Sequence, residues 1–332
     1  MIRKGRGVST IFYPSGFDGG GDPDLVTLRM KPDGTIDVSN ASCEMGQGIK
    51  NVAVQIAAEA LGIGVDRMNF DNRDSDNAAF SMDTAGTRST VVVGNAIIAA
   101  ANDLIDQFKD FVAGKFGVSK DEMSYAEGRT FVTADPEKGM TIPEIAGATI
   151  YGGILLTGRG GFLPEVAGPR DPKTGATNQK KVLAYGSCVA DVEVDDETGM
   201  VRVVNIFNCY DMGTVINPSQ ALSQVEGGNI MGIGMALFED LAPNFPNNLD
   251  MYAANFTDYI VPTFMDSPDR VETTFYENYD PVGPFGAKGC GEMVVDTQSP
   301  AIVNAIYDAV GVVVESLPAS PDKVLRLIKE KQ

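Results

Sequence analysis

The sequence predicts an α+β fold for this chain of 332 residues, from three observations. Short runs rich in β-branched residues alternate with stretches whose apolar residues recur at helical spacing. Hairpin patterns are frequent, and residues 189–194 and 201–207 flank an Asp-Asp-Glu-Thr-Gly turn. Apolar residues make up 43% of the chain, which is enough for a sizeable core. We therefore expect one domain over residues 1–332, built from two intertwined subdomains of mixed α/β structure.

The first half of the chain alternates predicted strands and helices. Residues 25–30 and 35–38 read as strands around a Pro-Asp-Gly turn. A helix should follow Gly48 and run to about Leu61, because Gly62 suits a helix stop. Three further features are a long helix at roughly 91–113 and two capping boxes, at 119–122 and 141–144.

The second half should begin with an exposed loop near residues 157–181, which is rich in Gly, Pro and Lys. Asn217 and Pro218 open a predicted helix to about Glu239, broken at Gly227-Gly228. Met231 and Met235 have the spacing of core residues on it. A last helix should start with Ser299 as N-cap and Pro300 at its first position, and end at Gly311.

Composition excludes several kinds of chemistry. The chain has no histidine, which removes Ser-His-Asp catalysis and most protein-ligated zinc sites. Its four cysteines lie far apart, so no zinc ribbon or ferredoxin-like iron–sulfur site is expected on this chain. Any metal should therefore arrive on an organic cofactor and need no protein side chain as ligand.

Charge and hydropathy limit the kinds of partner and the cellular compartment expected for this chain. The net charge of −19 argues against binding to nucleic acid or to an anionic membrane. The first residues lack the apolar core of a signal peptide, and no run approaches about 20 apolar residues. The sequence therefore predicts a cytoplasmic protein.

Three loops that feed helices are candidates for ligand binding. Two glycines in the first loop would let the backbone approach a ligand, and the helix that follows offers N–H groups to an anion. In the second loop an arginine could pair with a phosphate and two hydroxyls could donate to it. The third loop, rich in glycine, could wrap a flat polar ligand. An ordinary turn or helix cap explains each loop equally simply. The residues are Gly46, Gln47 and Gly48; Thr87, Arg88, Ser89 and Thr90; and Lys288, Gly289, Cys290 and Gly291.

Three single residues complete the candidates. Glu292 follows the third loop, and a carboxylate beside a bound cofactor could accept a proton; a capping or solvent-exposed glutamate is the alternative. Gln224 could contact a ligand or satisfy the interior. Tyr13 could line a substrate pocket, although packing is the simpler role.

Taken in order, these motifs resemble the xanthine oxidase/aldehyde oxidoreductase family of molybdenum hydroxylases, in the second half of its molybdopterin-binding domain. The resemblance covers nearly the whole chain. It rests on the segments 44–59, 88–96, 215–228, 283–292 and 300–311.

The resemblance implies a cofactor and a set of roles. The cofactor would be molybdopterin cytosine dinucleotide, whose molybdenum carries a sulfido or selenido ligand. Glu292 would be the general base while water-derived oxygen reaches an electron-poor carbon. The three loops would hold the pterin, pyrophosphate or nucleotide, and Gln224 belongs to the same matching set.

The resemblance also implies partners, because subunits of the family are about twice as long and carry a first half that this chain lacks. A separate large molybdopterin subunit, an iron–sulfur subunit with 2Fe–2S clusters and an FAD subunit are expected. The split arrangement within the family implies hydroxylation of a small heteroaromatic, nicotinate to 6-hydroxynicotinate, with NADP as electron acceptor. A purine or aldehyde hydroxylase of the same split type, or a non-catalytic subunit that holds cofactor, remains an alternative.

Overall fold

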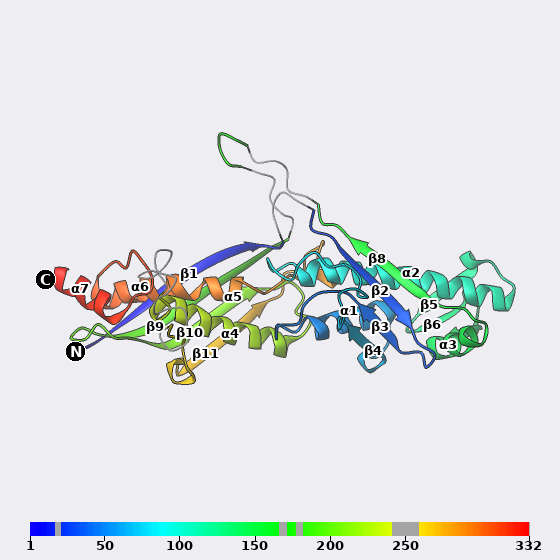
Figure 1. Cartoon of the computed structure of the whole chain (residues 1–332), viewed down its shortest axis with the longest axis horizontal. Helices are drawn as coiled ribbons and strands as arrows, with labels where there is room; N and C mark the ends of the chain where they lie inside the picture. Colours follow the sequence, from blue (N-terminus) through cyan, green and yellow to red (C-terminus); the bar gives the residue numbers. More distant parts are fainter. Residues whose placement is uncertain (17–20, 166–170, 177–181, 241–258, 332) are drawn as a thin grey trace. The chain divides into compact units, whose positions relative to one another are not determined.

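The computed structural model describes residues 1–16, 21–165, 171–176, 182–240 and 259–331, and the chain divides into two compact units (Figure 1). Unit 1 contains Met1–Tyr13, Leu183–Asn278 and Cys290–Gln332, whereas unit 2 contains Pro14–Val182 and Tyr279–Gly289. Both units combine helices with mixed sheets, which confirms the predicted α+β class.

Unit 2 is built on a four-stranded sheet in the order β4-β3-β2-β8, with a smaller sheet β5-β6-β7. The predicted strand pair and both capping boxes are confirmed. The elements are β2 (Asp24–Met30), β3 (Ile36–Ser39), α1 (Ile49–Leu61), β4 (Met68–Asp71), α2 (Ser89–Phe116), β5 (Met123–Ala126), β6 (Arg129–Val132), β7 (Asp135–Thr141), α3 (Ile142–Tyr151), β8 (Thr157–Phe162) and the short turns η1 (Val65–Arg67), η2 (Lys120–Glu122) and η5 (Pro284–Gly286).

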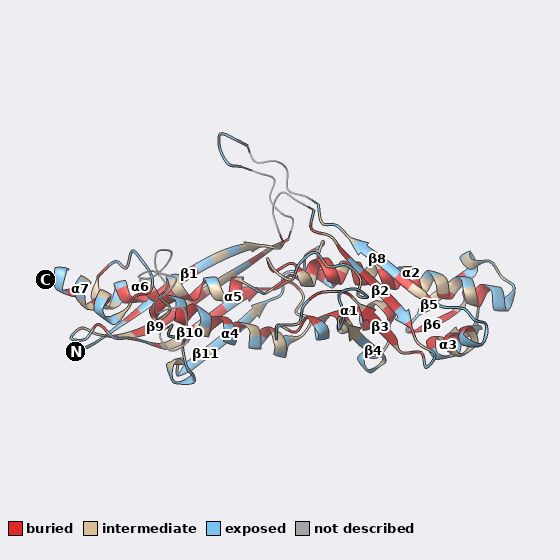
Figure 2. Ribbon diagram, viewed as in Figure 1, coloured by how far each residue is buried: buried red, intermediate tan, exposed pale blue. Residues whose placement is uncertain are grey.

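The helix α2 forms the centre of unit 2 and lies along β8, β2 and α1 (Figures 1 and 2). It begins before and ends after the predicted range, and Gly117 closes it in the left-handed conformation. Among the described residues α2 alone is long and apolar enough to cross a membrane, by length and composition only. However, 56% of its apolar window is buried inside the protein, and a core helix passes the same test.

The prediction of an exposed loop over residues 157–181 is wrong for its first part, because β8 pairs with β2. The glycines that suggested a loop are required by packing. A Cβ atom on Gly158 would lie 2.2 Å from the carbonyl oxygen of Ala100, and one on Gly160 would lie 2.2 Å from the amide nitrogen of Ala100. Residues 171–176 are exposed, and residues 166–170 and 177–181 lie outside the described residues.

Replacing Gly160 by alanine should therefore destabilise the protein by about 1–3 kcal/mol, since the new methyl group overlaps the backbone of α2. Denaturant unfolding measures this change. Gly114→Ala is the matched control, because Gly114 lies inside α2 with open space around it and should gain about 0.5–1 kcal/mol. Equal stability of the two variants would contradict the packing argument.

Unit 1 is built on a four-stranded sheet in the order β1-β9-β10-β11, and the predicted hairpin is its central pair. Residues of β9, β10, α4, α6 and α7 form a continuous apolar cluster. The elements are β1 (Ile2–Pro14), β9 (Leu183–Asp195), β10 (Val201–Asp211), α4 (Pro218–Leu237), η4 (Phe264–Asp266), β11 (Arg270–Tyr276), α5 (Met293–Asp296), α6 (Gln298–Val310) and α7 (Pro321–Lys331).

Three predictions about unit 1 are corrected. The helix α4 begins at the predicted cap but is not broken at Gly227-Gly228; instead a Cβ atom on Gly228 would lie 2.3 Å from the carbonyl oxygen of Val294. The N-cap of α6 is Thr297 rather than Ser299, whose hydroxyl donates to the carbonyl of Gly232 at 2.9 Å. The side chains of Met231 and Met235 are exposed rather than in the core.

Candidate functional site

The first candidate loop, Gly46 to Gly48, binds the carboxylate of Glu44, a residue of the same chain. One carboxylate oxygen of Glu44 accepts hydrogen bonds from the amides of Gly46 at 2.8 Å and Gly48 at 2.9 Å. The other accepts from the amide of Lys50, inside the first turn of α1, at 3.1 Å. A negative charge at a helix N-terminus is stabilised by the helix dipole. Three of the N–H groups predicted for a ligand anion are thus already occupied.

The amide of Gln47 is used within the same loop. Its oxygen accepts from the amide of Met45 at 2.6 Å, and its nitrogen donates to the carbonyl of Cys43 at 2.7 Å. Gly46 is exposed, has a φ of 103°, and a Cβ atom there would touch nothing within 4 Å. The loop therefore offers a ligand its backbone at Gly46 more readily than its side chains.

Glu44→Gln should weaken this loop in a pH-dependent way. Burial raises the pKa of Glu44, but donation from Gly48, Lys50 and Gly46 outweighs burial and lowers it below 4.5. A lowered pKa stabilises the fold above pH 4.5, and this contribution is lost as pH falls through the folded-state pKa. We expect Glu44→Gln to lose about 1 kcal/mol of unfolding free energy at neutral pH and nothing in acid.

The measurement is the difference in unfolding free energy between wild type and variant, followed from neutral to acid pH. Glu59→Gln is the control, because Glu59 lies exposed on the same helix. A difference that does not shrink as the pH falls would show that the carboxylate charge does not order the loop.

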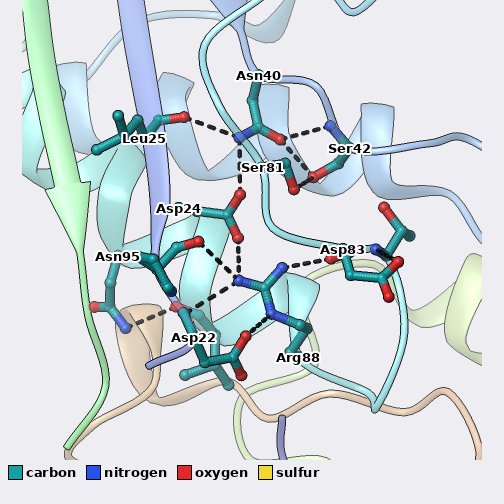
Figure 3. A network of polar contacts seen from close by, with 12 residues as sticks. Asp22, Asp24, Leu25, Asn40, Ser42, Ser81, Asp83, Arg88 and Asn95 are labelled. Atoms are coloured by element: carbon teal, nitrogen blue, oxygen red, sulfur yellow. Dashed lines mark hydrogen bonds and ion pairs between the residues drawn. The ribbon is translucent and has the colours of Figure 1, made fainter. Parts of the chain in front are cut away.

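The second candidate loop is organised by a buried arginine (Figure 3). The Arg88 side chain is 0% exposed, and its Nε atom forms an ion pair with Asp22. One terminal nitrogen lies 2.5 Å from Asp24 and also donates to the carbonyls of Asp22 at 3.1 Å and Pro23 at 3.2 Å. The other donates to the carbonyl of Asp83. The guanidinium thus links the start of β2 to the start of α2.

The two carboxylates extend this network into the neighbouring segments. Asp24 accepts from the amide of Asn40 at 3.2 Å, and the same amide donates to the carbonyl of Leu25 at 2.9 Å (Figure 3). The side-chain oxygen of Asn40 accepts a hydrogen bond from the backbone amide of Ser42 at 2.9 Å. The hydroxyl of Ser42 lies 3.2 Å from the hydroxyl of Ser81. Burial raises the pKa of Asp24, while Ser81, Arg88 and Asn40 oppose the rise.

This geometry does not fit the predicted pairing of the Arg88 side chain with a phosphate, since its partners are protein carboxylates and carbonyls. The neighbouring residues differ. Thr87 is buried with a φ of 55°, an unusual conformation for a residue other than glycine, and Ser89 and Thr90 are half-buried in the first turn of α2. Their roles toward a cofactor stay predictions.

The segment that leads into the third loop packs on α2, and the loop itself meets the second loop. The side chain of Asn95 donates to the carbonyl of Val282 at 2.9 Å, and Gly94 leaves room for Pro284. A Cβ atom on Gly289 would lie 2.1 Å from the carbonyl oxygen of Thr87.

These contacts bring the second and third candidate loops together within unit 2. The first loop joins them, because the amide of Cys43 donates to the hydroxyl of Thr84 at 2.9 Å. Lys288 is buried in the third loop, 6% exposed. Residues of the three loops, or directly beside them, are thus in contact through both backbone and side-chain groups.

The remaining candidates belong to unit 1. Glu292 is half-buried and directly precedes the one-turn helix α5. Burial raises the pKa of the neighbouring Asp296, and the charge of Glu292 raises it further. Gly291 is exposed, and Gln224 is half-buried on α4. Tyr13 and Cys290 pack against the same apolar cluster, which favours the packing role for Tyr13.

Metal ligation by side chains has no support among the described residues, where no three of His, Cys, Asp or Glu gather as a metal site. Burial raises the pKa of the Cys290 thiol to about 11, so the thiol is protonated near neutral pH.

Sequence reasoning missed the residues that hold the loops. The carboxylate partners of Arg88 lie more than 60 positions earlier in the chain, at Asp22 and Asp24. Glu44 could have been found, because a carboxylate two residues before a glycine at a helix start is a local capping signal. The buried hydroxyl of Ser15 has no hydrogen-bond partner within the described segments and gave no signal in the sequence.

Comparison with known proteins defines the class. Residues 1–268 match the family described as a molybdopterin cofactor-binding domain. The chain belongs to this family, as the molybdopterin-binding domain of xanthine oxidase/aldehyde oxidoreductase-type molybdenum hydroxylases.

Particular relatives follow from the same comparison. The chain is 30% identical to the nicotine 6-hydroxylase large subunit of Paenarthrobacter nicotinovorans, over 92% of this chain and 37% of that one. It is 30% identical to the aldehyde oxidoreductase of Megalodesulfovibrio gigas, over 98% of this chain and 32% of that one.

Two solved structures share the fold. The aldehyde oxidoreductase from Desulfovibrio gigas has a TM-score of 0.81 at 29% identity, covering 99% of this chain and 33% of that one. Quinoline 2-oxidoreductase from Pseudomonas putida 86 has a TM-score of 0.81 at 26% identity, covering 99% and 42%. The chain thus spans roughly a third to two fifths of the length of these relatives.

Proposed function

We propose that this chain is a catalytic part of a molybdenum hydroxylase that introduces water-derived oxygen at an electron-poor carbon of an N-heterocycle. The observation that carries the proposal is the third loop. It is ordered against α2 and Thr87 in unit 2, and three residues after Gly289 the chain reaches Glu292. A carboxylate at the end of an ordered cofactor loop suits general base catalysis.

The described residues fit a molybdopterin cofactor, provided that backbone groups do most of the binding. The three loops adjoin, Gly46 leaves open space, and Gly289 approaches Thr87 closely enough to exclude any side chain. We propose that Gly46, Gly48, Thr87, Ser89, Thr90 and the segment 288–291 hold the pterin dinucleotide. Gln47 and Arg88 shape these loops from within, and Gln224 is kept as a proposed cofactor contact on the family resemblance alone.

The bound cofactor supplies oxygen transfer and accepts two electrons. This chain supplies the proton acceptor and the positioning. Glu292 takes up the proton released as the oxygen nucleophile attacks, and the half-buried setting of its carboxylate limits competition from water.

The substrate we propose is nicotinate, hydroxylated to 6-hydroxynicotinate, as in a nicotinate dehydrogenase whose medium molybdopterin subunit this chain resembles. Relatives named for nicotine and quinoline support an N-heterocycle. Relatives named for xanthine and for aldehydes make a purine or an aldehyde the alternative.

We further propose a cytoplasmic complex with a large molybdopterin subunit, an iron–sulfur subunit and an FAD subunit that passes electrons to NADP. Relatives named as a large subunit, a large chain and a subunit of a dehydrogenase complex support a multi-subunit assembly. The cytosine dinucleotide form of the cofactor and a selenido rather than sulfido ligand belong to this proposal.

The test is to purify the complex that contains this chain and to measure its subunits, its molybdenum and the nucleotide released from the cofactor. The complex is then given nicotinate, a purine or an aldehyde in isotopically labelled water. Stoichiometric molybdenum, released cytosine nucleotide and labelled 6-hydroxynicotinate support the proposal. If the label appears in a purine or aldehyde product instead, that compound replaces nicotinate as the proposed substrate. A metal-free chain without partners would overturn the proposal.

A further inference from the structure

The helix that follows Glu292 is too short to hold itself in place. It contains only Met293–Asp296, and its internal support is donation from the amides of Val295 at 2.9 Å and Asp296 at 3.3 Å to the carbonyl of Glu292. Thr297 ends this helix and serves as the N-cap of α6. The direction of α5, and of the carboxylate before it, therefore depends on the packing of Met293 and Val294 and on what holds Thr297.

Thr297 is held by a closed ring of hydrogen bonds. The side-chain nitrogen of Gln298 donates to the hydroxyl of Tyr210 at 3.1 Å, and this hydroxyl lies 2.5 Å from that of Thr297. The Thr297 hydroxyl in turn donates to the side-chain oxygen of Gln298 at 3.2 Å. Since the Thr297 proton is used toward Gln298, the Tyr210 hydroxyl must be the donor to Thr297.

The ring is buried and is anchored to the rest of unit 1 at two points. Tyr210 and Gln298 are 0% exposed and Thr297 is 1% exposed. The nitrogen of Gln298 also donates to Asn229 of α4 at 2.6 Å, and the carbonyl of Thr297 accepts from Ser9 of β1 at 2.5 Å. A buried ring in which every member has a partner holds a single geometry.

Glycines make room for this arrangement. Gly186 on β9 pairs with Tyr210 on β10, and a Cβ atom there would lie 2.4 Å from the tyrosine ring. On α4, the absence of a side chain at Gly228 allows the backbone of α5 to lie close. A Cβ atom on Gly232 would lie 2.5 Å from the Cβ atom of Gln298. Gly228, which suggested a broken helix, instead acts together with Gly232 to let α5 and the start of α6 lie directly on α4.

We propose that Tyr210 is a positioning residue for Glu292: its hydroxyl, shared between Thr297 and Gln298, fixes the junction of α5 and α6 and with it the direction of the catalytic carboxylate. This inference rests on the proposed function. Burial raises the pKa of Tyr210 to about 12, while Thr297 and Gln298 oppose the rise, so the phenol remains a hydrogen-bond donor throughout the neutral range.

The test compares Tyr210→Phe with Tyr125→Phe in the purified complex. Tyr125 is the matched control in unit 2, because its half-buried hydroxyl donates to the carbonyl of Leu61 at 2.6 Å. Each variant loses one hydroxyl and the hydrogen bonds it makes, so both are expected to lose stability. For Tyr210→Phe, kcat should fall about 10- to 100-fold with little change in KM or molybdenum content. For Tyr125→Phe, kcat should stay unchanged.

Hydrogen exchange gives a readout independent of turnover. Amides of residues 293–298 should exchange faster in Tyr210→Phe than in wild type, and not in Tyr125→Phe. Equal kcat and equal exchange in the two variants would overturn the positioning role. If Glu292→Gln itself keeps full turnover, the proposed function fails, whatever Tyr210→Phe does.

Discussion

Replacing Glu292 by glutamine should lower kcat by about 100- to 10,000-fold, the range that general base catalysis contributes. The amide has nearly the shape of the carboxylate but cannot accept the proton. Because α5 is fixed by buried Met293 and Val294 and by the ring at Thr297, the substitution should leave the backbone in place. Molybdenum content and KM should change little. Steady-state kinetics and metal analysis of the same preparation measure all three quantities.

Glu315→Gln is the control, because Glu315 is exposed in the same unit and should keep full turnover. A non-catalytic subunit that only holds cofactor would retain both turnover and molybdenum when Glu292 is replaced. Loss of molybdenum together with turnover would instead assign Glu292 to cofactor binding.

Replacing Arg88 by methionine should destabilise the protein by about 3–5 kcal/mol, since it leaves two buried carboxylates without their cation. The side chains of Asp22 and Asp24 are 7% and 0% exposed, so water cannot take over this role. Because the network links the start of β2 to the start of α2, the second loop should also loosen. Denaturant unfolding measures the first effect, and hydrogen exchange at residues 85–90 measures the second.

Arg73→Met is the matched control, because Arg73 pairs with Asp71 at the surface with 84% of its side chain exposed, and little change in stability is expected. If the Arg88 side chain bound a cofactor phosphate instead, Arg88→Met would lower cofactor content without lowering the unfolding free energy of the cofactor-free chain. That result would restore the pairing predicted from sequence.

Local patterns predicted much of the fold correctly. The stop of α1 at Gly62, the two capping boxes, the hairpin of β9 and β10 and the start of α4 at Asn217 depend on residues close together in the chain. Such signals can be read from one sequence, because the groups that satisfy each other are only a few positions apart.

The errors have a common physical origin in distant packing. Glycines at 158, 160 and 228 were read as loop or break signals, yet each allows the close approach of a backbone far away in sequence. Ser299 looked like a helix cap, but α5 continues almost directly into α6 through Thr297. Within the site, the sequence singled out three loops as candidate cofactor segments, and that role stays a prediction. The internal contacts of Arg88 and Gln47 could not be predicted from sequence.

Each unit is built from separate stretches of the chain, which affects the order in which the two units can fold during synthesis. The strand β1 is synthesised before β9, its neighbour in the sheet, which begins only at Leu183. The segment Pro14–Val182, by contrast, contains all of the larger sheet of unit 2 together with α1 and α2. Unit 2 can therefore begin to fold while the chain is still growing, whereas unit 1 must wait until α6 has emerged. During that interval β1 exposes unpaired backbone, and a chaperone that shields extended segments should increase the yield of this protein when it is produced in a foreign host.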